Sequence, residues 1–169
     1  HRDSEKAFYH LTAACFEHRP IIGVSPERMF DFSTRLLNVL TDVHAEVEAW
    51  CVLPNHYHVL LRSDAVLVLL QEIGRLHGAT SFQWNGEDDT RGRQVWCKAA
   101  DRAMRSERHY WTTMNYIHHN PVRHGYVTRW QDWPFSSAPE FLETSGNERA
   151  TALWRDYPIL EYGKGWDEC

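Results

Sequence analysis

The stretch VHAEVEAWCVLPNHYHVLLR, residues 43–62, decides the fold that we expect for this chain. In its first half, apolar side chains occupy the odd positions and polar ones stand between them, a period of two that is typical of a half-buried strand. Pro54 and Asn55 predict a turn, after which a second extended run continues from His56 to Arg62. We therefore expect the two runs to pair as antiparallel neighbours in one sheet.

The second run begins with two histidines, His56 and His58, separated by one residue. Side chains two apart on a strand point to the same face, so the two imidazoles should lie side by side with Tyr57 turned the other way. Such a pair can chelate a metal ion, which would satisfy ring nitrogens that are costly to bury without a partner. A pair that hydrogen-bonds to backbone or water is the alternative.

The rest of the chain predicts further strands and helices. Ser25 followed by Pro26 is typical of a helix start, and apolar residues then recur at helical spacing to about residue 41. The other expected elements are a first strand at 8–16, a helix from Ser63 to about Trp84, a short strand at 93–97, and a helix from Asp101 or Ser106 that ends at Asn120 before Pro121. This order is compatible with an α+β fold, a ferredoxin-like antiparallel sheet with helices packed on one face.

The last of these helices carries Tyr116 and Asn120, which are four residues apart and therefore share a face. Asn120 could supply an oxygen ligand to the same ion that the phenol of Tyr116 faces. A phenol has a pKa near ~10, so it attacks an electrophile only when a cation or a base helps to remove its proton. A packed aromatic residue with no chemical role is the ordinary alternative for a tyrosine on a helix.

Charge is distributed unevenly along the chain. The net charge of the 169 residues is −5, yet residues 91–129 hold 8 basic and 2 acidic residues, a local net charge of +6. A basic face of this kind can attract phosphates even on an acidic protein. A solvated helix face with no ligand is the alternative.

Composition and cysteine use place the chain in a broad class. The apolar fraction of 43% excludes a disordered or low-complexity chain. No apolar run approaches the roughly twenty residues of a membrane span, and the first ten residues lack the apolar core of a signal peptide. The cysteines are scattered, so neither a zinc knuckle nor a disulfide framework is expected at Cys15, Cys51, Cys97 and Cys169. We expect a soluble cytoplasmic protein.

Three motifs together resemble one known family. PNHYHVLL, residues 54–61, resembles the His-hydrophobic-His (HUH) motif of single-tyrosine DNA-processing enzymes. YIHHNPVRHGYV, residues 116–127, followed by DWPFSS, residues 132–137, is similar to the signature of REP-associated tyrosine transposases. The likeness runs from about Tyr9 to Ser137 and includes YHLTAACF, residues 9–16, and VWCKAADRAMRS, residues 95–106.

The resemblance implies a role for each matching residue. His56 and His58 would be metal ligands, Asn120 the third ligand with His119 as the fallback, and Tyr116 the nucleophile. The family implies Mg²⁺ or Mn²⁺, whereas the imidazole pair alone would favour zinc or another softer metal. Residues 1–129 would form the single-tyrosine HUH domain, and residues 130–169 a C-terminal extension that wraps around it.

The implied reaction is cleavage of single-stranded DNA at palindromic (REP) hairpins by tyrosine attack, which yields a 5′-phosphotyrosine and a free 3′-hydroxyl. The DNA phosphates would be contacted by Arg102, Arg105, Arg108, Arg123 and Arg129. Such a protein is expected to be nucleoid-associated and to work as a monomer or homodimer. The alternatives are a hairpin-DNA-binding module that no longer cuts and a zinc-dependent hydrolase built on the histidines.

Overall fold

The structure is a computed structural model that describes residues 7–165. Cys169 and the first six residues of the segment considered for a signal peptide lie outside the described residues. The helices and strands, in chain order, are β1 (Ala7–Ala14), α1 (Pro26–Asp42), β2 (Glu46–Val52), β3 (His56–Ser63), α2 (Val66–Glu87), β4 (Ala100–Ala103), α3 (Glu107–Arg123), α4 (Ala138–Ser145) and α5 (Asn147–Asp156), with 3-10 turns at Phe16–His18, Ile22–Val24 and Trp130–Asp132.

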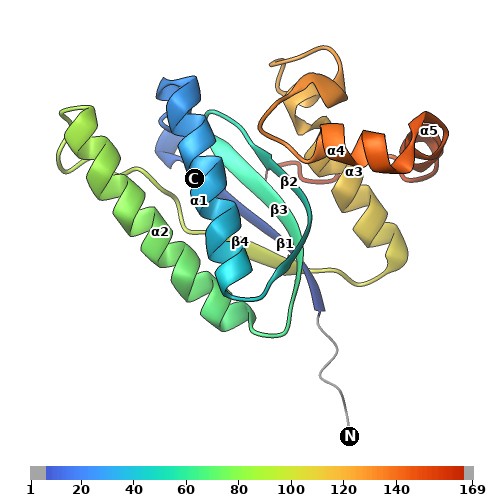
Figure 1. The fold of residues 1–169 in the computed structure, drawn as a ribbon, viewed down its shortest axis with the longest axis horizontal. Coiled ribbons are helices and arrows are strands. Elements are labelled where there is room, and N and C mark those ends of the chain that lie inside the picture. The colour runs from blue at the N-terminus through green and yellow to red at the C-terminus, as the bar shows by residue number, and fades with distance from the viewer. Residues whose placement is uncertain (1–6, 166–169) are drawn as a thin grey trace, which may run out of the picture.

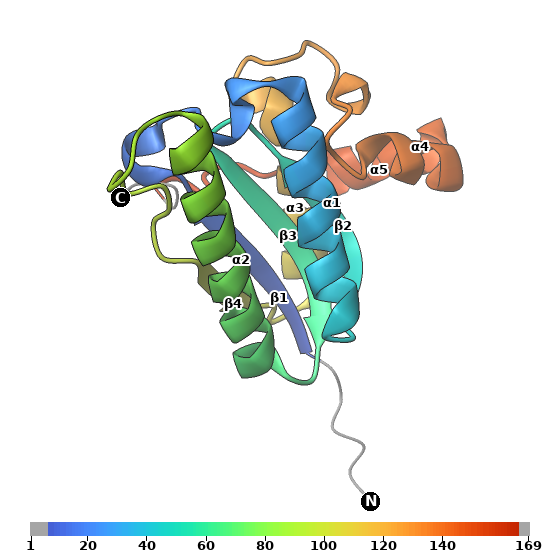
Figure 2. The same cartoon turned by 60° about the vertical axis from the view of Figure 1, so that its left-hand side comes forward.

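The four strands form one antiparallel sheet in the order β2-β3-β1-β4, so the α+β fold class is confirmed. Helices cover both faces of the sheet, not one as expected. Figures 1 and 2 show α1 and α2 on one face and α3 on the other, with α4 and α5 beyond it. The sheet therefore separates two apolar clusters, and the histidines of β3 face the one that α3 covers.

The strand pattern in β2 is interrupted by a bulge. The register of β2 against β3 shifts between Val47 and Ala49, so that Glu48 has no partner of its own. A bulge moves the following side chains to the opposite face. Val47 accordingly packs toward α1 and α2, whereas Ala49 and Cys51 pack beneath α3. The alternating pattern thus predicted the strand correctly. It wrongly implied that all the odd-numbered side chains lie on one face of the sheet.

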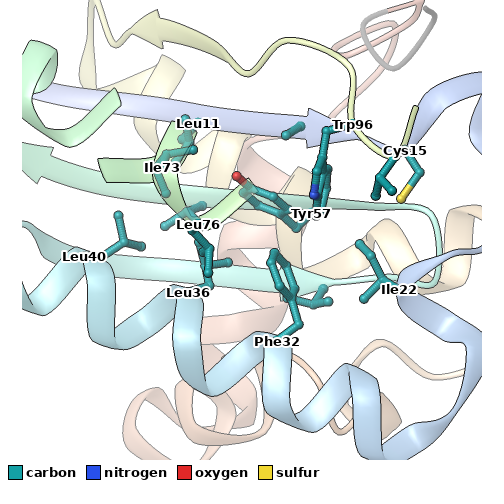
Figure 3. Close-up of a cluster of buried hydrophobic side chains, with 14 of the residues drawn as sticks. Leu11, Cys15, Ile22, Phe32, Leu36, Leu40, Tyr57, Ile73, Leu76 and Trp96 are labelled. Carbon is teal, nitrogen blue, oxygen red and sulfur yellow. The ribbon is translucent and has the colours of Figure 1, made fainter. Parts of the chain in front are cut away.

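The middle residue of the histidine triplet points away from the two histidines. Tyr57 is fully buried between the sheet and the helices α1 and α2, where its ring packs against Phe32 and Trp96 (Figure 3). Its hydroxyl forms a 2.8 Å hydrogen bond with Nε2 of His77 on α2. Burial of this large ring fixes the register of β3, and it thereby fixes which face His56 and His58 occupy.

Two elements differ from the expected bounds. The short strand lies at β4, and residues near Trp96 instead cross the end of β1, where they form an isolated bridge with Cys15. Helix α3 begins after its cap Ser106 and continues through Pro121 to Arg123. Pro121 lacks only the hydrogen bond to the carbonyl four residues earlier, and a helix tolerates this loss most easily in its last turn.

The chain beyond α3 runs along the sheet edge and returns over α3. The backbone N–H of Val52 donates to the carbonyl of Phe135 at 2.8 Å, and Ser136 bridges to Cys51. After α5, Asn115 of α3 donates to the carbonyls of Leu153 and Tyr157 at 2.9 and 3.0 Å. These contacts attach residues 133–157 to β2 and α3, while the proposed domain boundary at residue 129 stays a prediction.

The described cysteines include both free and disulfide-bonded residues. Cys15 and Cys51 are buried free thiols, as expected of small core residues. Cys97 is disulfide-bonded, which the scattered spacing did not predict. Within residues 7–165, no helix is both long and apolar enough to cross a membrane.

Candidate active site

Strand β3 and helix α3 bring together the four residues that the sequence singled out. His56 and His58 point toward α3, and Tyr116 and Asn120 point toward the sheet, all at most 1% exposed. His56 Nε2 lies 2.9 Å from Asn120 Oδ1, and the rings of His58 and Tyr116 are 5.1 Å apart at their centroids. The i, i+2 spacing on a strand and the i, i+4 spacing on a helix therefore meet in one buried cluster.

The contacts of His56 and Asn120 fit a cation between them. His56 Nδ1 lies 2.6 Å from Asn55 Oδ1, an atom that can only accept, and in the neutral tautomer that donates to it the proton is on Nδ1. Nε2 then presents a lone pair to Asn120 Oδ1, which presents another. Within residues 7–165, the buried Nδ2 of Asn120 has no hydrogen-bond partner. Two facing lone pairs repel each other unless a cation binds both, so these groups fit a metal site.

The electrostatics of the pair favour neutral imidazoles. Burial lowers the pKa of His56 to about 4, although Asn120 partly opposes that effect because its oxygen would accept a hydrogen bond from the protonated ring. Burial also lowers the pKa of His58 well below its usual value, and the neighbouring His56, His10 and His124 add to the shift. Only a neutral imidazole can coordinate a metal, so burial prepares both rings for that role. No three His, Cys, Asp or Glu side chains cluster as metal ligands in the described part of the chain.

Three neighbours of this cluster were not predicted from the sequence. His10 on β1 lies on the same sheet face as His58, and its Nε2 is 3.0 Å from His58 Nδ1. The ring of His124, after the end of α3, is 4.9 Å from that of His56. Tyr162, near the C-terminus, packs its ring 5.2 Å from that of Tyr116. His10 was contained in a matching motif, but nothing in the spacing distinguished it from other strand residues.

The segment that follows α5 covers the phenol of Tyr116. Gly163 approaches so closely that a Cβ atom at this position would lie 2.5 Å from the phenol oxygen. Arg123 donates to the carbonyl of Tyr162 at 3.2 Å and places its guanidinium carbon 5.4 Å from the ring centre of Tyr116. As a result Tyr116 is only 1% exposed. In this arrangement a ligand cannot reach the phenol unless Gly163 moves.

Comparison with known proteins points to a single family. No family model matches the chain. Over 107 residues it is 29% identical to an Escherichia coli protein named REP-associated tyrosine transposase, covering 60% of this chain and 59% of that one. Over 102 residues it is 28% identical to a Haemophilus influenzae protein provisionally given the same name, covering 54% and 58%. The chain resembles REP-associated tyrosine transposases.

A solved structure extends this resemblance to the fold. The structure of a REP-associated tyrosine transposase bound to a REP hairpin superposes with a TM-score of 0.62 at 23% identity, covering 92% of this chain and 84% of the other. At that identity the match shows a shared fold. The chain spans less than two thirds of the length of the two curated REP-associated tyrosine transposases, at 58% and 59%.

The fallback ligand His119 does not join the other site residues. Its ring stacks on Trp154 at 3.7 Å and on Trp130 at 5.1 Å, on a different face of α3 from Tyr116 and Asn120. Burial in this aromatic cluster lowers the pKa of His119 to about 4. Asn120, and not His119, therefore lies where it could bind an ion together with His56.

The five arginines expected to contact DNA extend from β4 through α3 to the segment that follows it. Arg102 pairs with His10 across β1 and β4 and so lies on the site face of the sheet, and Arg123 lies beside Tyr116. Arg105 and Arg108 are exposed near the start of α3, and Arg129 lies beyond its end, 3.7 Å from Asp132. Because a helix rises ~1.5 Å per residue, Arg108 and Arg123 are separated by about 22 Å. Only Arg102 and Arg123 flank the candidate site.

Proposed function

We propose that the chain is a metal-dependent single-stranded DNA endonuclease and strand transferase that cuts beside palindromic hairpins. Tyr116 would be the nucleophile, and His56, His58 and Asn120 would hold Mg²⁺ or Mn²⁺. The proposal rests on the convergence of a phenol, two imidazoles and an amide oxygen in one buried cluster. The resemblance to REP-associated tyrosine transposases supports it, since the solved relative is bound to a REP hairpin.

The proposed reaction is a transesterification. The phenol oxygen of Tyr116 loses its proton and attacks the phosphorus, a new P–O bond to the tyrosine forms, and the P–O3′ bond breaks. The departing O3′ takes up a proton and becomes a free 3′-hydroxyl. When bound, a divalent cation would polarise the phosphate and stabilise charge on the departing oxygen. The phosphotyrosine ester conserves the bond energy, so a 3′-hydroxyl can reverse the step and join strands.

The surrounding side chains would bind and orient the DNA. Arg102 and Arg123 flank the cluster and can pair with phosphates on either side of the cut. The phenol becomes available only after the backbone at Gly163 moves away from it. Because most of the affinity would come from phosphate and base contacts, His56→Ala should abolish cleavage and leave hairpin binding largely intact.

The deciding experiment measures covalent adduct formation. Protein incubated with a 5′-flanked hairpin oligonucleotide and Mn²⁺ should yield a denaturation-resistant protein–DNA adduct. Tyr116→Phe should abolish the adduct while fluorescence anisotropy still detects binding. Tyr110→Phe is the matched control, because Tyr110 lies on the same helix but its hydroxyl contacts Glu48 at 3.4 Å.

Each rival function predicts a different result. Continued cleavage by Tyr116→Phe would contradict the proposal and favour a hydrolase built on the histidines. If neither the wild type nor a variant with a displaced tail forms the adduct, and both bind the hairpin tightly, the chain is a binding module that does not cut.

A further inference from the structure

We propose that His10 is a positioning residue that holds His58 in the metal-binding tautomer, and that Tyr162 and Thr113 fix the direction of this hydrogen-bond chain. The inference rests on the proposed function in taking His58 as a metal ligand. It assigns a role to the buried His10 and to the tail tyrosine.

The chain of hydrogen bonds ends at a group that can only accept. Thr113 is fully buried on α3, and its Oγ1 donates to the backbone carbonyl of His109 at 2.8 Å. A hydroxyl has one proton, so Thr113 has none left for a second oxygen. Its remaining lone pair faces Tyr162, whose hydroxyl oxygen is 2.5 Å from Thr113 Oγ1. In this short contact Tyr162 must donate, which also agrees with a phenol being a stronger acid than an aliphatic alcohol.

Tyr162 therefore accepts from its other neighbours. Its hydroxyl oxygen lies 3.4 Å from His10 Nδ1 and 3.5 Å from His109 Nε2. The orientation of His109 supports this direction, because its Nδ1 accepts from the backbone N–H of Arg105 at 3.3 Å and its Nε2 consequently carries the proton. Both imidazoles then direct an N–H toward the oxygen of Tyr162.

The tautomer of His10 determines the tautomer of His58. With its proton on Nδ1, a neutral His10 presents a lone pair at Nε2, and His58 Nδ1 must donate to it across 3.0 Å. His58 then carries its proton on Nδ1 and a lone pair on Nε2, the nitrogen on the opposite side of the ring. Ligand histidines in metal sites are commonly held this way, with one nitrogen donating to a neighbour and the other facing the metal. If His10 Nε2 donated to His58 Nδ1 instead, a neutral His58 would carry its proton on Nε2, where the cation would bind.

Two readouts independent of cleavage test the inference. The first is the ¹⁵N chemical shift of the His58 imidazole in the metal-free full-length protein, assigned by its loss in His58→Gln. The wild type should show the Nδ1–H tautomer. His10→Phe, which removes the acceptor, should show a mixture or the Nε2–H form, and Tyr162→Phe should shift the population in the same direction.

The second readout is the affinity for Mn²⁺ alone, measured by calorimetry or electron paramagnetic resonance. We expect His10→Phe to weaken binding on the order of 10–100-fold. His10→Gln should rescue it, because a carboxamide can accept from His58 and donate to Tyr162. A purely structural role for His10 would lower thermal stability without changing the tautomer of the folded protein.

The outcomes separate this inference from the proposed function. A wild-type His58 protonated on Nε2, or an unchanged Mn²⁺ affinity in His10→Phe, would overturn the relay. If His58→Gln binds Mn²⁺ as the wild type does, the metal site itself is wrong, and the tautomer measurement still decides whether His10 sets the state of His58.

Discussion

Asn120 combines an amide nitrogen that has no partner within the described residues with an oxygen that faces the lone pair of His56 Nε2. Asn120→Asp replaces this nitrogen with oxygen and adds a buried negative charge. Without metal, the uncompensated carboxylate should destabilise the protein by on the order of 1–3 kcal/mol, a fall in Tm of about 2–10 °C. Mn²⁺ should then raise Tm more in this variant than in the wild type.

The control for this prediction is Asn115→Asp on the same helix. Asn115 is buried too, but both of its donated hydrogen bonds go to backbone carbonyls next to α5. The Asn115→Asp variant should therefore lose stability, and Mn²⁺ should not raise its Tm more than that of the wild type. Differential scanning fluorimetry with and without Mn²⁺ measures both variants, and equal Mn²⁺ responses of Asn120→Asp and the wild type would argue against Asn120 as a ligand.

Individual site residues differ in how far the sequence could predict them. His56, His58, Tyr116 and Asn120 were found because each pair lies within one element, where spacing fixes the shared face. His10 could not be paired with His58 in this way, because the two are 48 residues apart and meet only through the register of β1 against β3. Tyr162 is 152 residues from His10 in sequence, and a return of the chain over α3 leaves no periodic signal.

For whole strands, too, the local sequence pattern predicted only part of the structure. The pattern over residues 43–62 predicted two paired strands, but the bulge at Glu48 changed which face half of β2 presents. A bulge adds one unpaired residue without altering the local preference for extended backbone, so alternation cannot reveal it. The short strand was expected at residues 93–97 but is β4. The apolar residues Val95 and Trp96, on which the expectation depended, are instead buried at the end of β1.

The segment after α5 gives a prediction that two glycines can test. Gly163 and Gly165 have nearly the same backbone angle, with φ of +79° and +78°, but only Gly163 contacts Tyr116. An alanine at either position carries the strain of a left-handed conformation, about 1–2 kcal/mol. Only Gly163→Ala also forces a methyl group into the phenol. We expect Gly163→Ala to displace the backbone at this position from the phenol and to increase adduct formation on hairpin DNA.

Gly165→Ala should leave adduct formation near the wild-type level, which separates displacement from backbone strain. Hydrogen exchange of residues 157–165 provides a direct measure of displacement, with faster exchange expected for Gly163→Ala. Equal rates of exchange and of adduct formation in the two variants would mean that the contact with Tyr116 does not restrict access.

For the molecule as a whole, buried His77 predicts a loss of stability in acid. Its ring stacks on Trp96 at 4.1 Å and hydrogen-bonds Tyr57, and burial lowers its pKa from 6.5 to about 4. Below pH 6.5 the unfolded chain binds a proton that the folded protein does not. The free energy of unfolding should therefore fall between pH 6.5 and 4, by up to about 3 kcal/mol from this residue.

His77→Gln tests this contribution, because glutamine can still hydrogen-bond Tyr57 but does not titrate. Urea unfolding at several pH values should show a shallower pH dependence for the variant, by about one proton over this range. An unchanged slope would mean that His77 does not control acid stability.

The charge distribution of the molecule predicts how hairpin binding responds to salt. The chain is acidic overall, but residues 91–129 carry a net charge of +6 and include both arginines that flank the site. Each arginine that neutralises a phosphate releases counterions, so log Kd should vary linearly with log salt concentration. Arg102→Gln and Arg123→Gln should each reduce the magnitude of this slope by about 1.

Arg75→Gln is the control for the salt experiment. Arg75 is exposed on α2, across the sheet from the candidate site, and pairs with Glu72 at 3.1 Å. Fluorescence anisotropy between low and moderate salt should give this variant the slope of the wild type. Affinity that does not change with salt, or an equal loss of slope in Arg75→Gln, would exclude the face around Arg102 and Arg123 as the DNA-binding surface. A selective loss in the two site variants would instead place the phosphates beside Tyr116, as in-line attack requires.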